Sequence, residues 1–279
     1  MKNKPIIIVP GQPESIFFEI FFKIINSNSF LSPLILIGSK KILLNQIKKF
    51  NIKKKIRLLN FEHLNKTKLN NKSLNLLNIN YDFSKKKNIK NSKKYIEDCF
   101  NLAFKILQSK LTFKFINGPI NKSKFLDNKY PGFTEYVSNK FKVKKFAMLI
   151  YNNKLSVCPL TTHLPLKSVS KKINNKIIKE KISLINNFYT KTLGFKPKIG
   201  VTGLNPHCES SDKINEDKQI IIPSIKKLKK SGFKIFGPYP ADTIFLKKNR
   251  EKFDVILGMY HDQVLTPIKT LFEYDAINI

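Results

Sequence analysis

The sequence predicts an α/β fold with largely parallel sheets. Short apolar runs alternate with longer amphipathic runs along most of the 279 residues, and this alternation of strand and helix patterns is typical of βα units. Hydrophobic residues make up 42% of the chain and aromatic residues 11%, which is the composition of a globular protein and not of a disordered one. A chain of this length can bury one large core or two smaller ones.

The first part of the chain starts with two strand–helix units. Residues 4–10 and 33–38 are short apolar runs that predict strands. Residues 14–26 and 40–50 have apolar side chains at helical spacing and predict the helices that follow. Residues 51–91 are rich in Asn and Lys with weak periodicity, so we expect a loosely ordered, solvated insertion there.

The alternation continues to the end of the chain. A helix at 92–109, a strand at 113–118 and a short helix from Asn121 complete the first half. In the second half, strands are predicted at residues 145–151, 155–161, 198–204, 233–237 and 254–259. Helices are predicted at 174–192 and 214–230, the second with a kink at Pro223. We expect the boundary between two α/β halves to lie between residues 125 and 145.

The charge raises the question of nucleic-acid binding. Lys and Arg number 52 against 19 Asp and Glu, giving a net charge of +33. Only Arg57 and Arg250 are arginines, whereas readers of base edges and phosphates rely on arginine. Residue types with A/T-rich codons, such as Lys, Asn, Ile and Phe, are abundant throughout. We therefore interpret the charge as compositional drift and expect no specific nucleic-acid partner; a true binder would retain affinity at physiological salt.

Other protein classes receive little support. No apolar run reaches the ~18 residues needed to span a bilayer, so no membrane segment is predicted. Three widely spaced cysteines without a CxxC pair argue against a disulfide framework and a cysteine-bound zinc, and we expect a cytoplasmic protein. Neither GxGxxG nor GxxxxGK[ST] occurs, so an ordinary Rossmann cofactor site and a P-loop are not supported.

Three of the four histidines share one setting. His163 in SVCPLTTHLP, His207 in IGVTGLNPHCES and His261 in VILGMYHDQ each follow an apolar strand, while His63 has the surroundings of a surface residue. The carboxyl ends of parallel strands meet at one edge of a sheet, where α/β proteins gather ligand-binding groups. Three histidine ligands that leave coordination positions open are typical of a catalytic metal. The alternative is three unrelated loop histidines with local hydrogen bonds, because no short motif fixes their geometry.

Six segments then resemble one enzyme family. They are NGPINKSKF (117–125), PGFTEYV (131–137), TTHLPL (161–166), GLNPHCE (203–209), GPYPADTIF (237–245) and MYHDQVLTPIK (259–269). Together they resemble the 4-hydroxythreonine-4-phosphate dehydrogenase family of pyridoxal phosphate biosynthesis. The resemblance implies two α/β/α domains around a cleft, similar to isocitrate and isopropylmalate dehydrogenases, with residues 1–130 in the first domain and 131–279 in the second. It also implies a homodimer with an active site shared between subunits.

The family's site residues transfer by motif match. His163, His207 and His261 would bind a divalent metal (Zn, Mg or Co), with the strand before His261 delivering it to the metal. Thr134, Lys269 and Asn278 fall where the family contacts its phosphorylated hydroxy amino acid substrate, and a turn after His261 would bring Lys269 to the anionic groups. Lys122 and Asp242 are candidate proton acceptors. Lys122 would otherwise be an ordinary surface lysine, and Asp242 the N-cap of a helix beginning at Thr243.

The implied reaction is the oxidation of 4-phosphohydroxy-L-threonine by NAD or NADP. The product, 2-amino-3-oxo-4-phosphobutanoate, would lose carbon dioxide to give 3-amino-2-oxopropyl phosphate.

Two departures from the family pattern leave alternatives open. Position 133 is Phe where the family has His, which favours a relative acting on 4-phosphoerythronate or 4-phosphothreonate. The sequence also stops at YDAINI, where the family's chains continue. We therefore expect a C-terminally truncated member whose first domain the missing tail would complete, and an inactive fragment is the third possibility.

Overall fold

The computed structural model describes residues 3–85, 89–126, 129–130, 132–210 and 215–279. The chain forms two compact units, Met1–Lys129 and Tyr130–Ile279. Pro131 of the PGFTEYV segment and Ile214 at the start of the predicted helix 214–230 lie outside the described residues, as do residues 86–88 of the predicted insertion.

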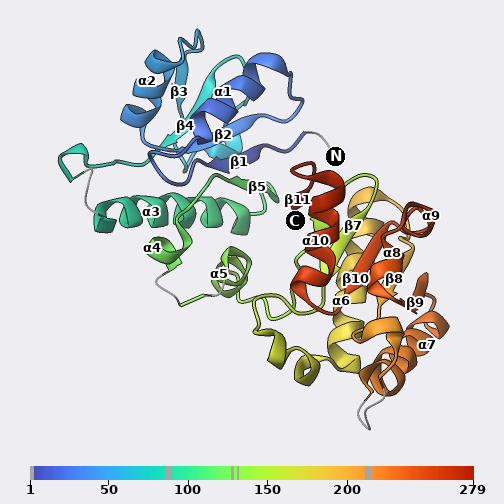
Figure 1. Cartoon of the computed structure of the whole chain (residues 1–279). Coiled ribbons are helices and arrows are strands. Elements are labelled where there is room, and N and C mark those ends of the chain that lie inside the picture. The colour runs from blue at the N-terminus through green and yellow to red at the C-terminus, as the bar shows by residue number, and fades with distance from the viewer. Residues whose placement is uncertain (1–2, 86–88, 127–128, 131, 211–214) are drawn as a thin grey trace. The chain divides into compact units, whose positions relative to one another are not determined.

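The first unit is built on a five-stranded parallel sheet with the order β3-β4-β2-β1-β5. Its strands are β1 (Ile6–Val9), β2 (Leu34–Gly38), β3 (Ile56–Leu58), β4 (Leu74–Asn78) and β5 (Lys114–Asn117). Its helices are α1 (Phe17–Ser27), α2 (Lys40–Lys49), α3 (Ile89–Gln108) and α4 (Lys122–Leu126), with short 3-10 turns η1 (Leu64–Lys66) and η2 (Phe83–Lys85). Helix α3 lies on the opposite face of the sheet from α1 and α2 (Figure 1).

The prediction of a loosely ordered insertion at residues 51–91 is wrong. This segment supplies β3 and β4, and β4 is an inner strand of the sheet. In the sequence LNLLN of β4, two asparagines interrupt the leucines. Asn75 is nevertheless only 1% exposed. Its amide nitrogen donates to the carbonyl oxygens of Leu34 (2.9 Å) and Asn70 (2.7 Å), so the folded sheet supplies the partners of this buried nitrogen. The Oδ1 atom has no hydrogen-bond partner within the described residues.

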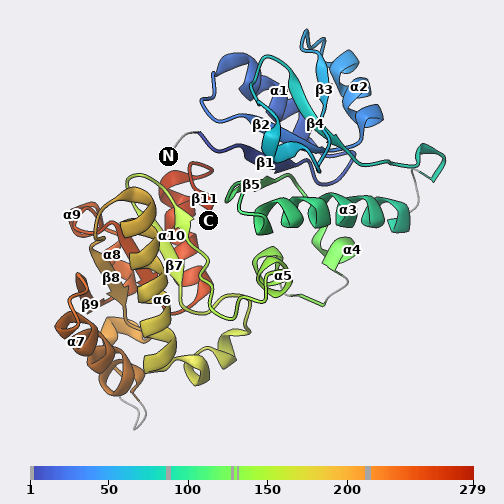
Figure 2. The ribbon, with the colours of Figure 1, turned by 180° about the vertical axis from the view of Figure 1, so that it is seen from behind.

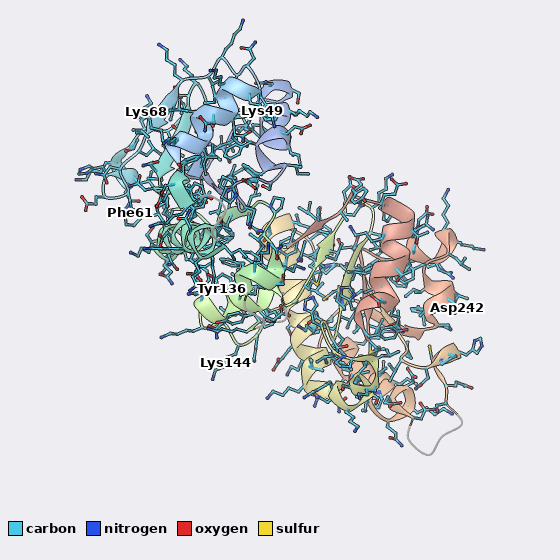
Figure 3. The ribbon with its side chains drawn as sticks, turned by 60° about the vertical axis from the view of Figure 1, so that its left-hand side comes forward. Lys49, Phe61, Lys68, Tyr136, Lys144 and Asp242 are labelled. Atoms are coloured by element: carbon cyan, nitrogen blue, oxygen red, sulfur yellow. The ribbon has the colours of Figure 1, made fainter. Side chains whose placement is uncertain are left out.

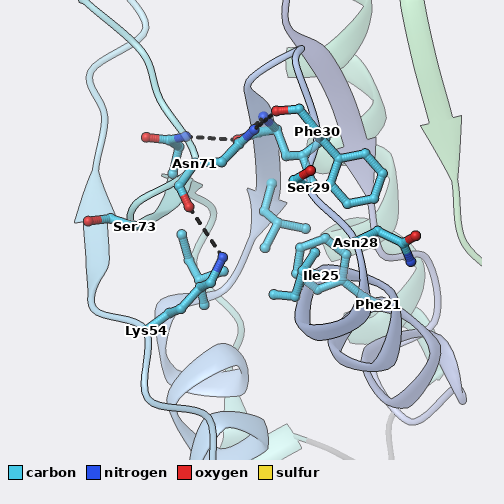
Figure 4. A pocket seen from close by; sticks show the side chains of 12 residues that line it. Phe21, Ile25, Asn28, Ser29, Phe30, Lys54, Asn71 and Ser73 are labelled. Atoms are coloured by element: carbon cyan, nitrogen blue, oxygen red, sulfur yellow. Dashed lines mark hydrogen bonds between the residues drawn. The ribbon is translucent and has the colours of Figure 1, made fainter.

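A cavity of about 230 Å³ lies between α1 and the amino-terminal ends of β2 and β4 (Figure 4). Its apolar side includes Phe21 and Ile25 of α1. On its polar side, Lys54 Nζ donates to the carbonyl oxygen of Asn71 (3.2 Å), and Asn71 Nδ2 donates to that of Phe30 (2.9 Å). α/β proteins usually bind ligands at the carboxyl ends of their strands. This cavity lies at the other edge of the sheet, where the strands begin.

The second unit contains a six-stranded mixed sheet with the order β11-β6-β7-β10-β8-β9. Its strands are β6 (Ile150–Tyr151), β7 (Ser156–Pro159), β8 (Ile199–Thr202), β9 (Ile235–Tyr239), β10 (Val255–Gly258) and β11 (Ile277–Asn278). Strands β7, β10, β8 and β9 are parallel. At one edge β6 pairs antiparallel with β7, and β11 pairs antiparallel with β6. Strand β6 is much shorter than the predicted 145–151.

Helices cover both faces of this sheet. The helices of this unit are α5 (Phe133–Lys140), α6 (Asn175–Phe188), α7 (Ile222–Lys230), α8 (Ala241–Ile244), α9 (Lys247–Arg250) and α10 (His261–Phe272). Five shorter helical turns are η3 (Leu166–Ser168), η4 (Ser170–Lys172), η5 (Tyr189–Leu193), η6 (Pro206–Cys208) and η7 (Asp217–Ile221). Pro223 lies in the first turn of α7, directly after the π-helical turn η7, so the irregularity of the predicted helix falls at this proline.

Side chains of β10 point alternately to the two faces of the sheet and pack into two separate apolar cores. Val255 and Leu257 pack with α6 and α7, whereas Ile256 packs with Val264 and Ile268 of α10. Helix α10 covers one face of the sheet (Figure 1) and α6 the other (Figure 2). Full burial of such aliphatic side chains contributes ~1.5–3 kcal/mol each, so β10 is anchored from both sides. The predicted α/β fold is confirmed.

No helix in the described part of the chain is both long enough and apolar enough to cross a membrane.

Two of the three cysteines should be unreactive while the protein is folded. Cys99 in α3 and Cys158 in β7 are free and buried, and burial raises the pKa of each thiol to about 12. A pKa raised this far leaves both thiols protonated at pH 8, and the thiolate is the nucleophile. We expect neither to be alkylated by iodoacetamide until guanidinium unfolds the chain, as followed by mass spectrometry. Rapid modification of either one in the folded protein would contradict this packing.

Candidate functional site

The parallel strands of the second unit bring the three strand-end histidines to one edge of the sheet. Strand β10 pairs in parallel with β7 on one side and β8 on the other. His163 follows β7, His207 follows β8 and His261 follows β10. Asp242 follows β9, which pairs with β8. The carboxyl ends of four neighbouring strands therefore carry four of the predicted site residues.

His163 is held by a carboxylate that the sequence did not single out. Its Nδ1 lies 3.3 Å from Oε1 of Glu135 in α5, and the hydroxyl of Thr162 donates to the same oxygen (3.3 Å). Gly132 permits this approach, because a methyl group at position 132 would lie 2.7 Å from both His163 Cε1 and Glu135 Oε2. With Nδ1 occupied by Glu135, the Nε2 atom of His163 is the nitrogen left for a ligand.

Glu135 Oε2 is buried and lacks a hydrogen-bond partner within the described residues. A positive charge lies nearby on Lys181 of α6. Burial lowers the pKa of the Lys181 ammonium, and the neighbouring acidic groups of Cys158 and Glu135 act in the opposite direction. The side chain of Glu135 is 16% exposed. Its carboxylate is therefore largely shielded from solvent and lies beside the imidazole of His163.

His261 is the first residue of α10, and its Nδ1 lies 2.7 Å from Oδ1 of Asp262. The prediction that a turn leads from His261 to Lys269 is wrong, since both lie on one helix. Eight residues of α-helix correspond to a separation of about 12 Å along the axis. Pro267 lies inside this helix and obscured it in the sequence, because proline usually ends a helical pattern.

The imidazoles of His163 and His261 are neighbours, with ring centroids 6.0 Å apart. Both rings are about one-third exposed, and both have Nδ1 beside a carboxylate. Carboxylate–histidine pairs of this kind orient histidines that bind metals through the other ring nitrogen. The donor chemistry of this His163–His261 pair therefore fits a divalent cation.

His207 lies in a separate, tightly anchored loop. Asp217, which is fully buried, accepts hydrogen bonds from the backbone N–H groups of Leu204 (2.9 Å) and Asn205 (3.1 Å) and from Asn205 Nδ2 (3.0 Å). His207 itself has a left-handed backbone with φ 55° and an exposed side chain. Cys208 beside it is buried, and burial followed by the charge of Asp217 raises the pKa of its thiol.

One chain does not assemble the three predicted ligands. Among residues 3–85, 89–126, 129–130, 132–210 and 215–279, no three His, Cys, Asp or Glu side chains are grouped closely enough to hold a metal ion. The chain itself supplies the His163–His261 pair, and the His207 ring stands apart from that pair.

The other predicted site residues lie on different elements of the two units. Thr134 is half-buried in α5, while Lys269 in α10 and Asn278 in β11 are exposed. Lys269 Nζ lies 5.7 Å from the ring centroid of Tyr274. Lys122 is the exposed first residue of α4 in the first unit.

The prediction that Asp242 caps a helix is wrong. Asp242 lies inside α8, whose N-cap position is Pro240 and which has no side-chain cap. The side chain of Asp242 is at the surface (Figure 3). Helix α8, which carries Asp242, contacts β8, the strand that precedes the His207 loop.

The positive charge is spread over separate elements. Lys49 of α2, Lys68 in the segment between β3 and β4, and Lys144 after α5 are all exposed (Figure 3). The expectation of no specific nucleic-acid partner stays a prediction.

Sequence reasoning missed Glu135, Asp217 and Gln263. Glu135 belongs to the quoted PGFTEYV segment, but its role depends on the approach of the His163 loop from the end of β7. Asp217 lies ten residues after His207 in a polar stretch, and nothing local distinguishes it from its neighbour Glu216. Gln263 belongs to the quoted MYHDQVLTPIK segment, but its partners Thr202 and Gly203 lie about 60 residues away along the chain.

The chain was compared with known proteins. A family model described as "Pyridoxal phosphate biosynthetic protein PdxA" matches residues 30–279. A 4-hydroxythreonine-4-phosphate dehydrogenase from Sulfurihydrogenibium sp. (strain YO3AOP1) is 38% identical over 213 residues, covering 74% of this chain and 64% of the relative. A D-threonate 4-phosphate dehydrogenase from Pectobacterium atrosepticum is 33% identical over 165 residues, covering 58% of this chain and 50% of the relative.

These two alignments span about half to two thirds of the length of the curated relatives. Among solved structures, a 4-hydroxythreonine-4-phosphate dehydrogenase from Klebsiella pneumoniae superposes with a TM-score of 0.79 at 25% identity, covering 99% of this chain and 87% of that one. A family match over most of the sequence and agreement of the fold lead to one conclusion. The chain belongs to the PdxA family of pyridoxal phosphate biosynthetic proteins.

Proposed function

We propose that this chain is an NAD(P)-dependent, metal-assisted dehydrogenase that oxidises 4-phosphohydroxy-L-threonine in pyridoxal phosphate biosynthesis. The observation that carries the proposal is the His163–His261 pair at the carboxyl edge of the parallel strands. Both imidazoles have Nδ1 beside a carboxylate, which leaves both Nε2 atoms for a cation. Membership of the family supports the same reaction.

The proposed reaction balances as a hydride transfer. The carbon that bears the substrate hydroxyl loses a hydride to the nicotinamide ring, and the hydroxyl proton leaves to a base or to water. The products are 2-amino-3-oxo-4-phosphobutanoate and NADH or NADPH. The β-keto acid then loses carbon dioxide and takes up a proton, which gives 3-amino-2-oxopropyl phosphate. A bound divalent cation (Zn, Mg or Co) lowers the pKa of a hydroxyl that it coordinates.

The roles of the surrounding residues follow from their chemistry. Thr134 and Asn278 offer neutral hydrogen-bonding groups, and Lys269 offers a point charge for a phosphate. Lys122 and Asp242 are the proposed proton acceptors. The contact of α8 with β8, the strand that precedes the His207 loop, supports Asp242.

A homodimer is part of the proposal. One chain provides two imidazoles in contact range, and a catalytic metal usually has three protein ligands. In a twofold dimer each site can receive His207 from the partner chain, and two equivalent sites then form. The three free cysteines support a cytoplasmic location, because oxidising compartments favour disulfides.

A related sugar-acid phosphate is the second candidate substrate. Phe133, the first residue of α5, replaces an imidazole with a phenyl ring that cannot make a hydrogen bond to the substrate. One matched relative is named D-threonate 4-phosphate dehydrogenase. Both observations favour 4-phosphothreonate or 4-phosphoerythronate as an alternative.

The activity itself is the first test. We expect the protein loaded with Zn²⁺, Mg²⁺ or Co²⁺ to reduce NAD or NADP when 4-phosphohydroxy-L-threonine is added. His163→Ala, His207→Ala and His261→Ala should each lower kcat/KM by more than ~100-fold, since even outer-shell partners of metal ligands cost ~10–100-fold. His63→Ala, an exposed histidine of the first unit, is the matched control and should leave kcat/KM unchanged.

Failure of the proposal has a clear signature in this assay. Absence of turnover with every metal and both cofactors would exclude the dehydrogenase. Faster turnover of 4-phosphothreonate or 4-phosphoerythronate than of the amino acid would replace the first substrate with the second candidate.

Phe133→His tests whether the phenyl ring weakens substrate binding. Restoring one buried hydrogen bond should contribute ~1–3 kcal/mol, which lowers KM for 4-phosphohydroxy-L-threonine by roughly 5–150-fold. Steady-state kinetics of Phe133→His beside Phe133→Leu, which restores no hydrogen bond, separates polarity from size. An equal KM for the two variants would show that position 133 does not contact the substrate.

Glu135→Gln tests the carboxylate behind His163. The amide retains the shape of the side chain but removes the negative charge that orients the imidazole, so affinity for Zn²⁺ should fall ~10–100-fold. The readout is competition with a chromophoric chelator. Glu62→Gln, an exposed residue of the first unit, provides the control, and equal affinities for the two variants would remove Glu135 from the site.

A further inference from the structure

Gln263 of α10 is a buried side chain whose polar atoms are all engaged. It is 9% exposed. Its Oε1 accepts hydrogen bonds from the Met259 backbone N–H (2.7 Å) and from the Thr202 hydroxyl (2.7 Å). Its Nε2 donates to the carbonyl oxygen of Gly203 (2.8 Å). These are three short bonds in a buried setting, where a lost partner leaves an unsatisfied polar group.

The three partners come from the ends of two neighbouring strands. Thr202 is the last residue of β8, and Gly203 begins the loop that carries His207. Met259 follows β10 and precedes His261 by two residues. Strands β8 and β10 are paired directly. Gln263 therefore bridges the two chain segments that lead to His207 and His261, just beyond the last residues of their strands.

The same set of bonds extends to the third histidine loop. The Thr161 hydroxyl donates to the carbonyl oxygen of Met259 (2.8 Å), and the Thr161 backbone N–H donates to the same oxygen (3.3 Å). Thr161 lies two residues before His163. Met259 is thus bonded to Gln263 through its N–H and to the His163 loop through its carbonyl. The bases of all three histidine loops are joined by one continuous hydrogen-bond network.

We infer that Gln263 is a positioning residue that holds the bases of the histidine loops in place, so that each imidazole is presented to its divalent cation in the orientation that binds at full affinity. This inference rests on the proposed function. A metal-binding geometry has to be held within a fraction of an ångström by supporting groups. Gln263 hydrogen-bonds the backbone at Met259 and Gly203 and the hydroxyl of Thr202, so its effect on the imidazoles is carried by the chain segments that hold them.

Glutamine is the side chain that this position requires. The amide combines an oxygen that accepts two bonds with a nitrogen that donates one. Glutamate has the same shape but cannot donate to Gly203, and it would place an ionised oxygen against that carbonyl. Leucine fills similar space but makes no hydrogen bond. The two substitutions therefore separate loss of one bond from loss of all three.

The test measures metal affinity and local opening in the full chain. Zn²⁺ affinity is obtained by chelator competition, and hydrogen–deuterium exchange reports on the Met259 amide. We expect Gln263→Glu and Gln263→Leu to weaken Zn²⁺ binding by ~10–100-fold, as for other outer-shell groups, and Gln263→Leu to speed exchange at Met259. Gln108→Glu, on the exposed end of α3, is the matched control and should bind Zn²⁺ like the wild type.

A milder variant keeps the test valid if these substitutions prevent folding. Thr202→Val removes one donor to Gln263 Oε1 and preserves the side-chain shape. We expect it to weaken Zn²⁺ binding by several-fold with a native circular dichroism spectrum. A folded Thr202→Val or Gln263→Leu protein with wild-type Zn²⁺ affinity would overturn the inference, even if its unfolding temperature fell, because the role would then be structural only.

The outcomes also separate this inference from the proposed function. A wild-type protein that binds Zn²⁺ but oxidises none of the three substrates would remove the dehydrogenase, while the Gln263 variants would still decide the positioning role. A wild-type protein that binds neither Zn²⁺ nor Co²⁺ would overturn both.

Discussion

Parallel pairing of β7, β10 and β8 determines where the chemistry of this protein lies. Because the three strands run in one direction and are adjacent, their carboxyl ends form one edge, and the loops that leave this edge carry His163, His261 and His207. The apolar cores on both faces hold the strands in register, so the edge is set by the most buried part of the second unit. The polar site is therefore a consequence of where the apolar strands end.

Within one chain, only two of the three proposed ligand histidines lie close together. His163 and His261 are neighbours and are each oriented by a carboxylate, whereas His207 is held in a separate loop by the buried Asp217. This asymmetry is the arrangement expected if one chain contributes two imidazoles to a centre and another chain the third. Orientation of each ring before metal binding lowers the cost of assembling such a centre, because little side-chain freedom remains to be lost.

Sequence patterns predict the strands and helices that bury apolar side chains. They do not predict elements or side-chain roles that depend on contacts between residues far apart in the chain. The runs around β1, β7 and β10 were unambiguous because both faces of these strands are buried. Strand β4 was missed because the amide of Asn75 finds its partners only in the folded sheet. The strand-end positions of the histidines were predictable, but the roles of Glu135 and Gln263 were not, since their partners lie 28 and 60 residues away along the chain.

In the proposed site, His163, His207 and His261 bind one divalent cation. X-ray absorption at the zinc edge of the Zn²⁺-loaded protein tests this directly, because imidazole rings give a characteristic outer-shell scattering pattern. We expect three imidazole nitrogens at ~2.0–2.1 Å, with a fourth position open to water or substrate. A spectrum dominated by oxygen ligands, or one with a single imidazole for each zinc, would contradict it.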